Sequence, residues 1–484
     1  MPSSAPVPAV AIAKAGLARR VAVTLAVALS AAACGGPDSS PITATAAIAG
    51  DPVACAAPPH VSNLPAGPAD WPVYHRAADR HGVDPTSQVT RRMTPLWGAR
   101  LDGSMFAQPL VVQGLLIEAT EHDSVYAFDA TSGCTAWRTS LGTPLDTNRH
   151  RLQCNNITPE LGITATPAID TTTSTIYVVA YFDPGRYEMD ALDLGTGAVR
   201  WRHPIDLPNS DELQQLSRPA IALANGRAYA SFGGRAGDCG LFHGFVVGVN
   251  TDGTGPDLLF QAGPAKAAIW APGGPVVMPD GDLLVSTGNT DEQKQYDGNN
   301  AVDRLSPSLT LRDFFAPNNW KHLNQVDFDL GSVGPTLLAG DRVFQVGKDG
   351  IGYLLDANHL GGIGAQLFGE VLNGGCYAIG ATAYRAPLVY VPCDHSLTAV
   401  RVAGSRFDVA WRSPDFRSGS PIVAAGMVWD FDFEGGSLWG FEPLSGAVRQ
   451  KVSVGYGEHF VSLSSSSGRL YVPARRNLYA FSLA

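Results

Sequence analysis

Four side chains in the middle of the chain follow short apolar segments and could take part in chemistry. They are Asn289 in Ser-Thr-Gly-Asn, Asp327 and Asp329 in Val-Asp-Phe-Asp, and Lys348 in Lys-Asp-Gly. Carboxylate and amide oxygens are the ligands of hard cations, a carboxylate can accept a proton, and an ammonium group stabilises developing negative charge. Simpler roles are equally open: Asn forms turns, Asp caps backbone amides, and Lys pairs with carboxylates. The elements that position these residues decide whether they form one site.

The segments between these residues are typical of antiparallel β-strands. From Trp270 to Asp356, apolar runs alternate with corners that carry Gly, Asn or Asp. The chain has 53 Gly, 35 Pro and 9 Trp and no convincing amphipathic helix, which predicts a large all-β domain. The net charge of -10, without a basic run, argues against a nucleic-acid partner.

One unit recurs along the chain and predicts the architecture. It consists of a strand x-Tyr/Leu-x-Ala-hydrophobic-Asp, a Thr/Ser-Gly turn and a strand that carries Trp. The clearest copies span 125–142 and 189–206, degenerate copies follow, and the eighth, 478–484, stops at its third strand. The missing strand is available at 93–103. We therefore expect an eight-bladed β-propeller of four-stranded antiparallel blades, closed by an N-terminal strand that completes the last blade. The tryptophans of these strands would pack blades together: Trp97, Trp137, Trp201 and Trp411.

The N-terminal region predicts export. Lys14, Arg19 and Arg20 precede an apolar run from Val21 to Ala33, which is the length of a signal-peptide core. The run ends in Ala-Ala-Ala-Cys34, which resembles the lipobox of bacterial lipoproteins and implies a lipid on Cys34; cleavage near Ala33 without lipidation is the alternative. We expect a signal peptide at 1–33, a flexible Pro/Ala/Ser-rich tether at 34–69 and the propeller at 70–484. The protein would then lie outside the cytoplasm, anchored to the outer face of the cell membrane.

Propeller topology predicts that the candidate residues share one face. The strands of a blade run from a, the innermost, to d, the outermost, and the b–c and d–a loops open on the same face. Asn289 and Lys348 follow the b strands of blades 4 and 5. A b–c loop carries Asp238, and d–a connections carry Trp270 and Asp327. We therefore expect all five near the axis on one face.

Six cysteines remain after Cys34, and an even number in an exported chain favours three disulfides. Cys376 and Cys393, at the a and b strands of one blade, should pair. The remaining pairs would be Cys154 with Cys239 on the same face and Cys134 with Cys55 of the tether. No Cys-x-x-Cys-His is present, so no covalent c-type haem is expected.

The recurring unit resembles the repeat of pyrroloquinoline quinone (PQQ) propellers. The segment Asp70-Trp71-Pro-Val-Tyr74 with Arg80 to Val83 resembles the segment that precedes such propellers, so the resemblance covers about 70–484. It is specific for the fold and less so for the activity, because the same repeat also builds scaffolds without a cofactor.

The candidate residues resemble the site of PQQ-dependent quinoprotein dehydrogenases, and the resemblance implies a role for each. Trp270 would form the floor under the cofactor. Asp238 and Asn289 would hold Ca²⁺ together with Asp327, which would also act as the catalytic base. Lys348, before Asp-Gly and Tyr-Leu-Leu-Asp, would stand at the quinone oxygens.

Three features depart from this family. The family's pair of adjacent cysteines is absent, since at the nearest place Cys154 is followed by Asn155 and not by a second cysteine. Val326 replaces the Trp before the catalytic Asp, and no haem domain follows.

The resemblance implies an exported PQQ- and Ca²⁺-dependent oxidoreductase, a monomer, that acts on an alcohol or a sugar. The alternatives are a non-enzymatic scaffold for protein–protein interaction in envelope assembly, and a module that binds sugar or cell wall. A deep cavity over Trp270 would favour the enzyme, whereas a face filled by loops such as 290–299 and an exposed apolar patch at a rim would favour a scaffold.

Overall fold

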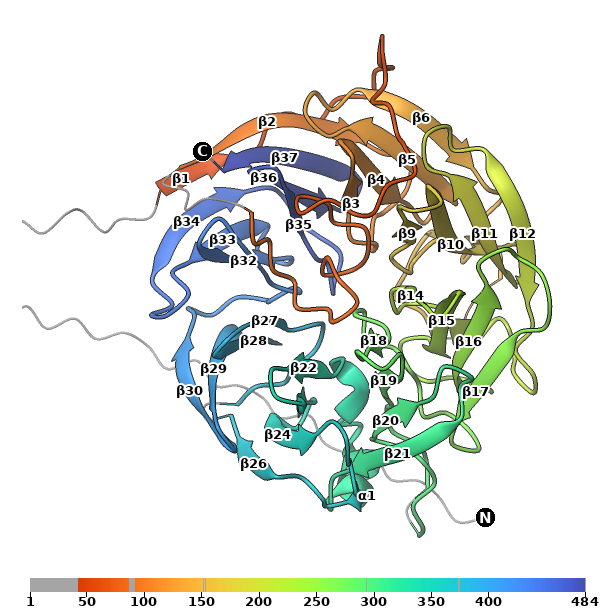
Figure 1. The fold of residues 1–484 in the computed structure, drawn as a ribbon, viewed down its shortest axis with the longest axis vertical. Helices are drawn as coiled ribbons and strands as arrows, with labels where there is room; N and C mark the ends of the chain where they lie inside the picture. Colours follow the sequence, from red (N-terminus) through yellow and green to blue (C-terminus); the bar gives the residue numbers. More distant parts are fainter. Residues whose placement is uncertain are drawn as a thin grey trace, which may run out of the picture. The chain divides into compact units, whose positions relative to one another are not determined.

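The propeller is built from eight β-sheets placed around a common centre (Figure 1). The computed structural model of the protein describes residues 42–86, 92–150, 152, 154–292, 294–372 and 375–483. Pro41–Ala484 form one compact unit. The predicted signal peptide and Cys34 lie outside the described residues. No helix in the described ranges is long and apolar enough to cross a membrane.

The first four blades follow one another along the chain, and each has four antiparallel strands. From the inner to the outer strand they are β3 (Leu110–Val112), β4 (Leu115–Ala119), β5 (Ser124–Asp129) and β6 (Thr135–Ser140) in blade 1; β9 (Ala168–Asp170), β10 (Thr175–Phe182), β11 (Arg186–Asp193) and β12 (Val199–Ile205) in blade 2; β14 (Ala222–Ala224), β15 (Arg227–Gly234), β16 (Gly244–Asn250) and β17 (Leu258–Ala262) in blade 3; and β18 (Val276–Val277), β19 (Leu283–Ser286), β20 (Val302–Leu305) and β21 (Leu311–Ala316) in blade 4.

The next three blades repeat this order, and blade 8 takes three of its strands from the C-terminal end of the chain. The strands are β22 (Thr336–Leu338), β23 (Arg342–Val346), β24 (Ile351–Asp356) and β26 (Phe368–Val371) in blade 5; β27 (Ala383–Arg385), β28 (Leu388–Cys393), β29 (Ser396–Ala403) and β30 (Arg406–Arg412) in blade 6; β31 (Ile422–Ala424), β32 (Met427–Asp432), β33 (Ser437–Phe441) and β34 (Val448–Ser453) in blade 7; and β35 (Ser464–Ser466), β36 (Arg469–Ala474), β37 (Asn477–Leu483) and β2 (Met93–Arg100) in blade 8.

Blade 8 closes the ring, as the incomplete eighth repeat predicts. β2 pairs antiparallel with β37 from Met93 opposite Leu483 to Arg100 opposite Asn477. The eight-bladed propeller with an N-terminal closing strand is therefore confirmed. The closing strand covers the outer edge of β37, which would otherwise be free to pair with another chain.

A few short elements lie outside the blades. β7 (Leu145–Asp146) and β8 (Glu160–Leu161) form a hairpin between blades 1 and 2, β13 (Gln215–Leu216) pairs with β15, and β25 (Gly362–Ile363) runs parallel to β21. Between blades 4 and 5 stand the helix α1 (Trp320–Val326) and the 3₁₀ turn η1 (Leu330–Ser332).

Burial explains why the inner and middle strands are almost continuously apolar. All eight residues of β10 are buried, because neighbouring blades cover both of its faces. The outer strand β12 alternates between more and less exposed positions, since one of its faces meets solvent.

The tryptophans of the outer strands join neighbouring blades, as expected. Each packs against the turn glycine of the following blade, and the glycine has a positive φ: Trp97 on Gly133, Trp137 on Gly197, Trp201 on Gly253 and Trp411 on Gly446. A Cβ atom on any of these glycines would lie 2.4 to 2.6 Å from the indole ring. The Thr/Ser-Gly turn of the repeat is thus needed both for its backbone conformation and for the contact between blades.

The segment before the first blade lies at the centre of the ring, between the inner strands in Figure 1. Its contacts reach all eight blades, and four of them run to blades 1, 3, 5 and 7. They are a bridge from Trp71 to Val111, a hydrogen bond from Arg80 Nη2 to the carbonyl of Ile221, one between His81 Nε2 and the carbonyl of Leu337, and a bridge from Val83 to Val423. One short segment therefore connects the inner strands of the propeller.

Part of the segment that we expect to be a tether touches the propeller. β1 (Ile42–Thr45) runs parallel to β34 of blade 7, Gly50 bridges to Ala99 of blade 8, and Ala54 bridges to Thr135 of blade 1. Cys55, one residue further on, forms a disulfide with Cys134. Contacts with the blades therefore begin before residue 70.

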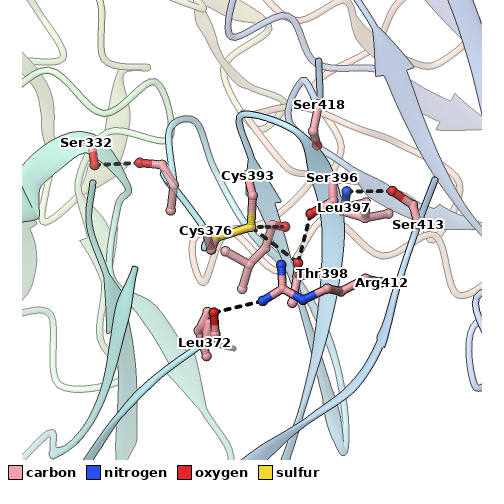
Figure 2. Close-up of a disulfide and its surroundings, with 12 residues drawn as sticks. Ser332, Leu372, Cys376, Cys393, Ser396, Leu397, Thr398, Arg412, Ser413 and Ser418 are labelled. Carbon is pink, nitrogen blue, oxygen red and sulfur yellow. Dashed lines mark hydrogen bonds between the residues drawn. A yellow bond between two sulfur atoms is a disulfide. The ribbon is translucent and has the colours of Figure 1, made fainter. Parts of the chain in front are cut away.

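All three predicted disulfides are present: Cys55–Cys134, Cys154–Cys239 and Cys376–Cys393. Figure 2 shows the third, in which Cys393 ends β28 and its Sγ atom lies 3.3 Å from Thr398 Oγ1 on the adjacent strand. One detail of the expectation is wrong. Cys376 lies in the connection that leads to blade 6 rather than at the start of an a strand, because β27 begins only at Ala383.

Candidate functional site

The five candidate residues line one cavity of about 510 Å³. Asp238 comes from the loop between β15 and β16, and Trp270 from the connection between β17 and β18. Asn289 and Lys348 follow β19 and β23, and Asp327 stands between α1 and η1. Side chains from three blades thus meet because their loops open on the same face.

Lys348 forms ion pairs with both carboxylates of the Asp-Phe-Asp segment. Its Nζ atom lies 2.8 Å from Asp329 Oδ2 and 3.5 Å from Asp327 Oδ2. The side chains of Lys348 and Asp329 are 10% and 6% exposed, whereas that of Asp327 is 62% exposed. Burial by itself would lower the pKa of Lys348, but the charges of Asp329 and Asp327 outweigh it and hold this pKa above its usual value. Lys348 therefore carries a positive charge throughout the physiological range.

The backbone around Asp327 explains why two carboxylates two residues apart have such different exposure. Asp327 ends α1 with a φ of 57°, and its amide donates to the carbonyl of Leu323. This left-handed residue reverses the chain. Asp327 is left at the cavity surface, and Asp329 is buried, where its Oδ1 accepts the amide of Asn289 at 2.7 Å.

Asn289 and Asp238 present oxygen atoms to the cavity. Asn289 Nδ2 donates to Asp327 Oδ1 at 3.1 Å, and its amide oxygen accepts no hydrogen bond from the described residues. The carboxylate of Asp238 has no such partner in the described ranges either. Burial, helped by the negative charges of Asp329 and Asp327, raises the pKa of Asp238 to about 6.

These oxygens fit a hard cation by type and charge. Asp238, Asn289 and Asp327 offer two carboxylates and an amide, and the four Asp side chains that line the cavity outnumber its three cationic ones, those of Arg218, Arg235 and Lys348. The arrangement is not yet that of a bound metal, because the described chain places no three His, Cys, Asp or Glu side chains around one point. Binding would require Asn289 to exchange its contact with Asp327 for one with the cation.

The floor of the cavity is aromatic. The ring of Trp270 lies 5.8 Å from that of Phe460, with an angle of 59° between them, and Lys348 Nζ is 5.4 Å from the centre of the indole. Tyr377, next to Cys376, also lines the cavity. Phe460 and Tyr377 were not among the sequence candidates. Both lie in d–a connections, as Trp270 does, so the same topological argument applied to the last blades would have found them.

The described residues of the loop 290–299 leave the cavity open, and only Asp291 among them lines it. The first residues of the loop are held against α1: the amide of Thr290 donates to Asn324 Oδ1 at 3.2 Å, and Asn324 Nδ2 donates to the carbonyl of Glu292 at 2.6 Å. Asp291 contributes to the wall and pairs with Lys266 at 2.8 Å.

The disulfide Cys154–Cys239 stands beside Asp238. It links the connection into blade 2 to the b–c loop of blade 3, and Cys154 Sγ lies 3.4 Å from the carbonyl of Gly237. Gly237, Asp238 and Asn156 all line the cavity. A covalent bond between two blades thus stands next to one wall of the cavity.

Comparisons with known proteins agree with this fold. A model of the family described as outer membrane protein assembly factor BamB matches residues 93–237. A search of curated protein sequences finds no match.

Solved structures of three relatives resemble the chain. A quinohemoprotein alcohol dehydrogenase from Comamonas testosteroni has a TM-score of 0.66 at 14% identity, over 86% of this chain and 80% of its own. A europium-containing methanol dehydrogenase has 0.67 at 13%, over 86% and 98%. BamB from Moraxella catarrhalis has 0.56 at 15%, over 81% and 98%.

The chain is thus a β-propeller of the PQQ-like type, as the repeats indicate. The same fold occurs in two alcohol-oxidising enzymes and in an assembly factor, so the fold by itself does not assign an activity.

Proposed function

We propose that the protein is a PQQ- and Ca²⁺-dependent oxidoreductase that acts on alcohols or sugars. The observation that carries this proposal is the cavity in which Trp270, Asp238, Asn289, Asp327 and Lys348 meet. A scaffold needs no such cavity. The high exposure of Asp327 in a cleft with an aromatic floor suits a group that must reach a substrate.

Each side chain would have a separate task. Asp238, Asn289 and Asp327 would hold the cation, and Trp270 would support the flat cofactor. Bound PQQ and Ca²⁺ would supply a two-electron acceptor and a Lewis acid. Asp327 would accept the hydroxyl proton of the substrate at its exposed carboxylate. Lys348, fixed by Asp329, would place a permanent positive charge above Trp270.

We also propose that the protein is exported and anchored through a lipid on Cys34. Its three disulfides support an oxidising compartment. Mass spectrometry of the mature N-terminus tests this, because an unlipidated end near Cys34 would contradict the anchor.

Titration of the full-length protein with PQQ, with and without Ca²⁺, tests the cofactor site. We expect one equivalent to bind in a Ca²⁺-dependent manner, with quenching of Trp fluorescence and a calorimetric signal. Asn289→Ala and Trp270→Ala should abolish this binding. Trp439→Ala is the matched control, because Lys451 also lies over Trp439, at 3.9 Å, but outside the cavity. An absence of binding at tens of micromolar, roughly 6 to 7 kcal/mol of affinity, would exclude the quinoprotein function.

A scaffold for protein–protein interaction is the second candidate. Three apolar side chains, on β25, on β26 and in the segment that joins them, support it, since Ile363, Leu367 and Val371 are 44%, 46% and 52% exposed. The match to the assembly-factor family is a further reason. If PQQ does not bind, replacement of these three residues by Ser should impair envelope assembly in cells while the purified variant remains folded.

A further inference from the structure

The N-terminal segment joins the propeller at its outer rim, beside blades 7 and 8 (Figure 1). β1 pairs in parallel with β34, the outermost strand of blade 7, with Ile42 opposite Gln450. The carbonyl of Gly50 then accepts the amide of Arg100 on β2, the outermost strand of blade 8, at 2.8 Å. The first described residues of the chain therefore lie on the outer edges of two neighbouring blades.

Chain length limits how far this rim can stand from a lipid on Cys34. Cys34 precedes Ile42 by eight positions. A fully extended chain spans about 3.3 to 3.6 Å per residue, so the two residues are at most about 26 to 29 Å apart. Ile42 is fixed on β34 by strand pairing. A membrane that held the lipid would therefore pass close to blade 7, either along its outer rim or along one face of the ring.

Exposed apolar side chains distinguish the rim from the faces. Ile48, between β1 and the contact with blade 8, is 96% exposed, and Leu96 on β2 is 43% exposed. Leu444 precedes β34 and Tyr456 follows it, and they are 66% and 61% exposed. The two ends of an outer strand point to opposite faces of a propeller. A ring that lay flat on a membrane would therefore bury Leu444 or Tyr456, whereas a ring on its edge brings both to the bilayer.

The outer strands of the same two blades carry positive charge, although the chain has a net charge of -10. Arg449 and Lys451 lie on β34, and Arg100 lies on β2. β1, β34 and β2 contain no Asp or Glu. Asp102, two residues after β2, is paired with Arg138 of blade 1. Cations beside apolar and aromatic side chains suit the interface of an anionic bilayer.

We propose that the outer rim of blades 7 and 8 is the surface that contacts an anionic lipid bilayer, so that the propeller stands on its edge. The orientation rests on the proposed lipid on Cys34: the anchor holds the protein at the bilayer, and the rim determines how the protein lies there. The cavity opens on a face of the ring, so its mouth then opens along the bilayer and not towards it.

Fluorescence quenching by spin-labelled lipids tests the orientation on the full-length lipidated protein. The vesicles contain phosphatidylcholine and phosphatidylglycerol, and an environment-sensitive dye is attached to one added cysteine. Leu96→Cys and Leu444→Cys place the dye at the rim. Leu311→Cys on β21 and Leu259→Cys on β17 are the matched controls, because these leucines are 45% and 41% exposed on the outer strands of blades 4 and 3, across the ring. We expect quenching at positions 96 and 444 and none at positions 259 and 311.

The possible outcomes separate the orientation from the anchor. Equal quenching at all four positions would overturn the orientation. Quenching of a dye at only one end of β34, at position 444 or with Tyr456→Cys, would show a ring that lies flat and would overturn it as well. Mass spectrometry of the same samples identifies the lipid. An unlipidated N-terminus would refute the anchor together with the orientation that rests on it, whereas a lipidated protein without preferential quenching would refute the orientation alone.

A charge variant tests the contact of β34 with the head groups. Arg449→Gln combined with Lys451→Gln should weaken the quenching at position 96 on the anionic vesicles, because two cations that attract the head groups are lost. Arg312→Gln combined with Lys321→Gln is the control, since both side chains are exposed near blade 4, and it should leave the quenching unchanged. Unchanged quenching in a folded variant of β34 would contradict the proposed contact.

Discussion

Asp238 is the residue whose protonation should control cation binding. Its pKa of about 6 means that the carboxylate is largely neutral at pH 5 and charged at pH 7. We expect the affinity for Ca²⁺ to rise between these values and then to level off, because a metal ligand must be deprotonated. Calorimetry across this pH range measures the effect. Asp238→Asn should bind Ca²⁺ more weakly and remove the pH dependence.

The same shift has an opposite effect on the metal-free fold. The folded pKa of Asp238 is raised from 3.8, so protonation favours the folded state. Stability from this group is therefore present at low pH and is lost as the pH rises from about 4 to about 6. Asp252→Asn is the control for both experiments, since Asp252 lies in an exposed turn between β16 and β17. A Ca²⁺ affinity that stays flat between pH 5 and 7 would show that Asp238 is not a ligand.

At the scale of single residues, the sequence predicts which loops carry the candidate side chains but not which of these side chains touch one another. Propeller topology assigns Asp238, Asn289 and Lys348 to one face, since each follows a strand whose direction the repeat defines. The pairing of Lys348 with the buried Asp329 depends on the turn at the end of α1, which no repeat contains. Arg218 and Phe460, more than 200 positions apart, come together only through the closed ring.

At the scale of elements, the turn glycines should be the most sensitive positions of the repeat. Gly197 has a φ of 71°, and a Cβ atom there would lie 2.4 Å from Trp137. Gly197→Ala should lower the free energy of unfolding by roughly 2 to 5 kcal/mol, the sum of backbone strain and overpacking. Denaturant unfolding measures this change.

Gly226 is the matched control for this prediction. Its φ is also 71°, but no atom lies within 4 Å of the position of a Cβ. Gly226→Ala should therefore cost only the backbone term, about 1 to 2 kcal/mol. If the two substitutions were equally costly, the contact between the glycine and the tryptophan would not hold neighbouring blades together.

The recurring unit is the reason that the blades could be predicted so completely. Its alternation of Tyr or Leu with Ala marks a buried strand, and the contact between its Trp and the Gly turn of the next blade recurs at four junctions. α1 and the short hairpin of β7 and β8 have no counterpart in other blades. Their sequences therefore carried no periodic signal, and the expectation of a domain without a notable helix missed α1.

At the scale of the whole molecule, two disulfides of similar loop length should have different consequences. The cysteines of Cys55–Cys134 are 79 positions apart in the sequence, and those of Cys154–Cys239 are 85 positions apart. Replacing either pair by Ser should lower the free energy of unfolding by about 2 to 5 kcal/mol. Only loss of the second pair should speed amide hydrogen exchange at residues 235–240, next to the cavity. Equal exchange in both variants would show that Cys154–Cys239 does not hold this loop.

The pairing of β2 with β37 has a consequence for biogenesis. Met93 lies opposite Leu483, so the earliest strand of the ring has no partner until the last one has been made. At roughly 5 to 20 residues per second, synthesis of the intervening chain takes about 20 to 80 seconds. During that time the edge of β2 is open to pairing with other chains. A chain of this kind would depend on a chaperone that protects the nascent protein until its C-terminus emerges.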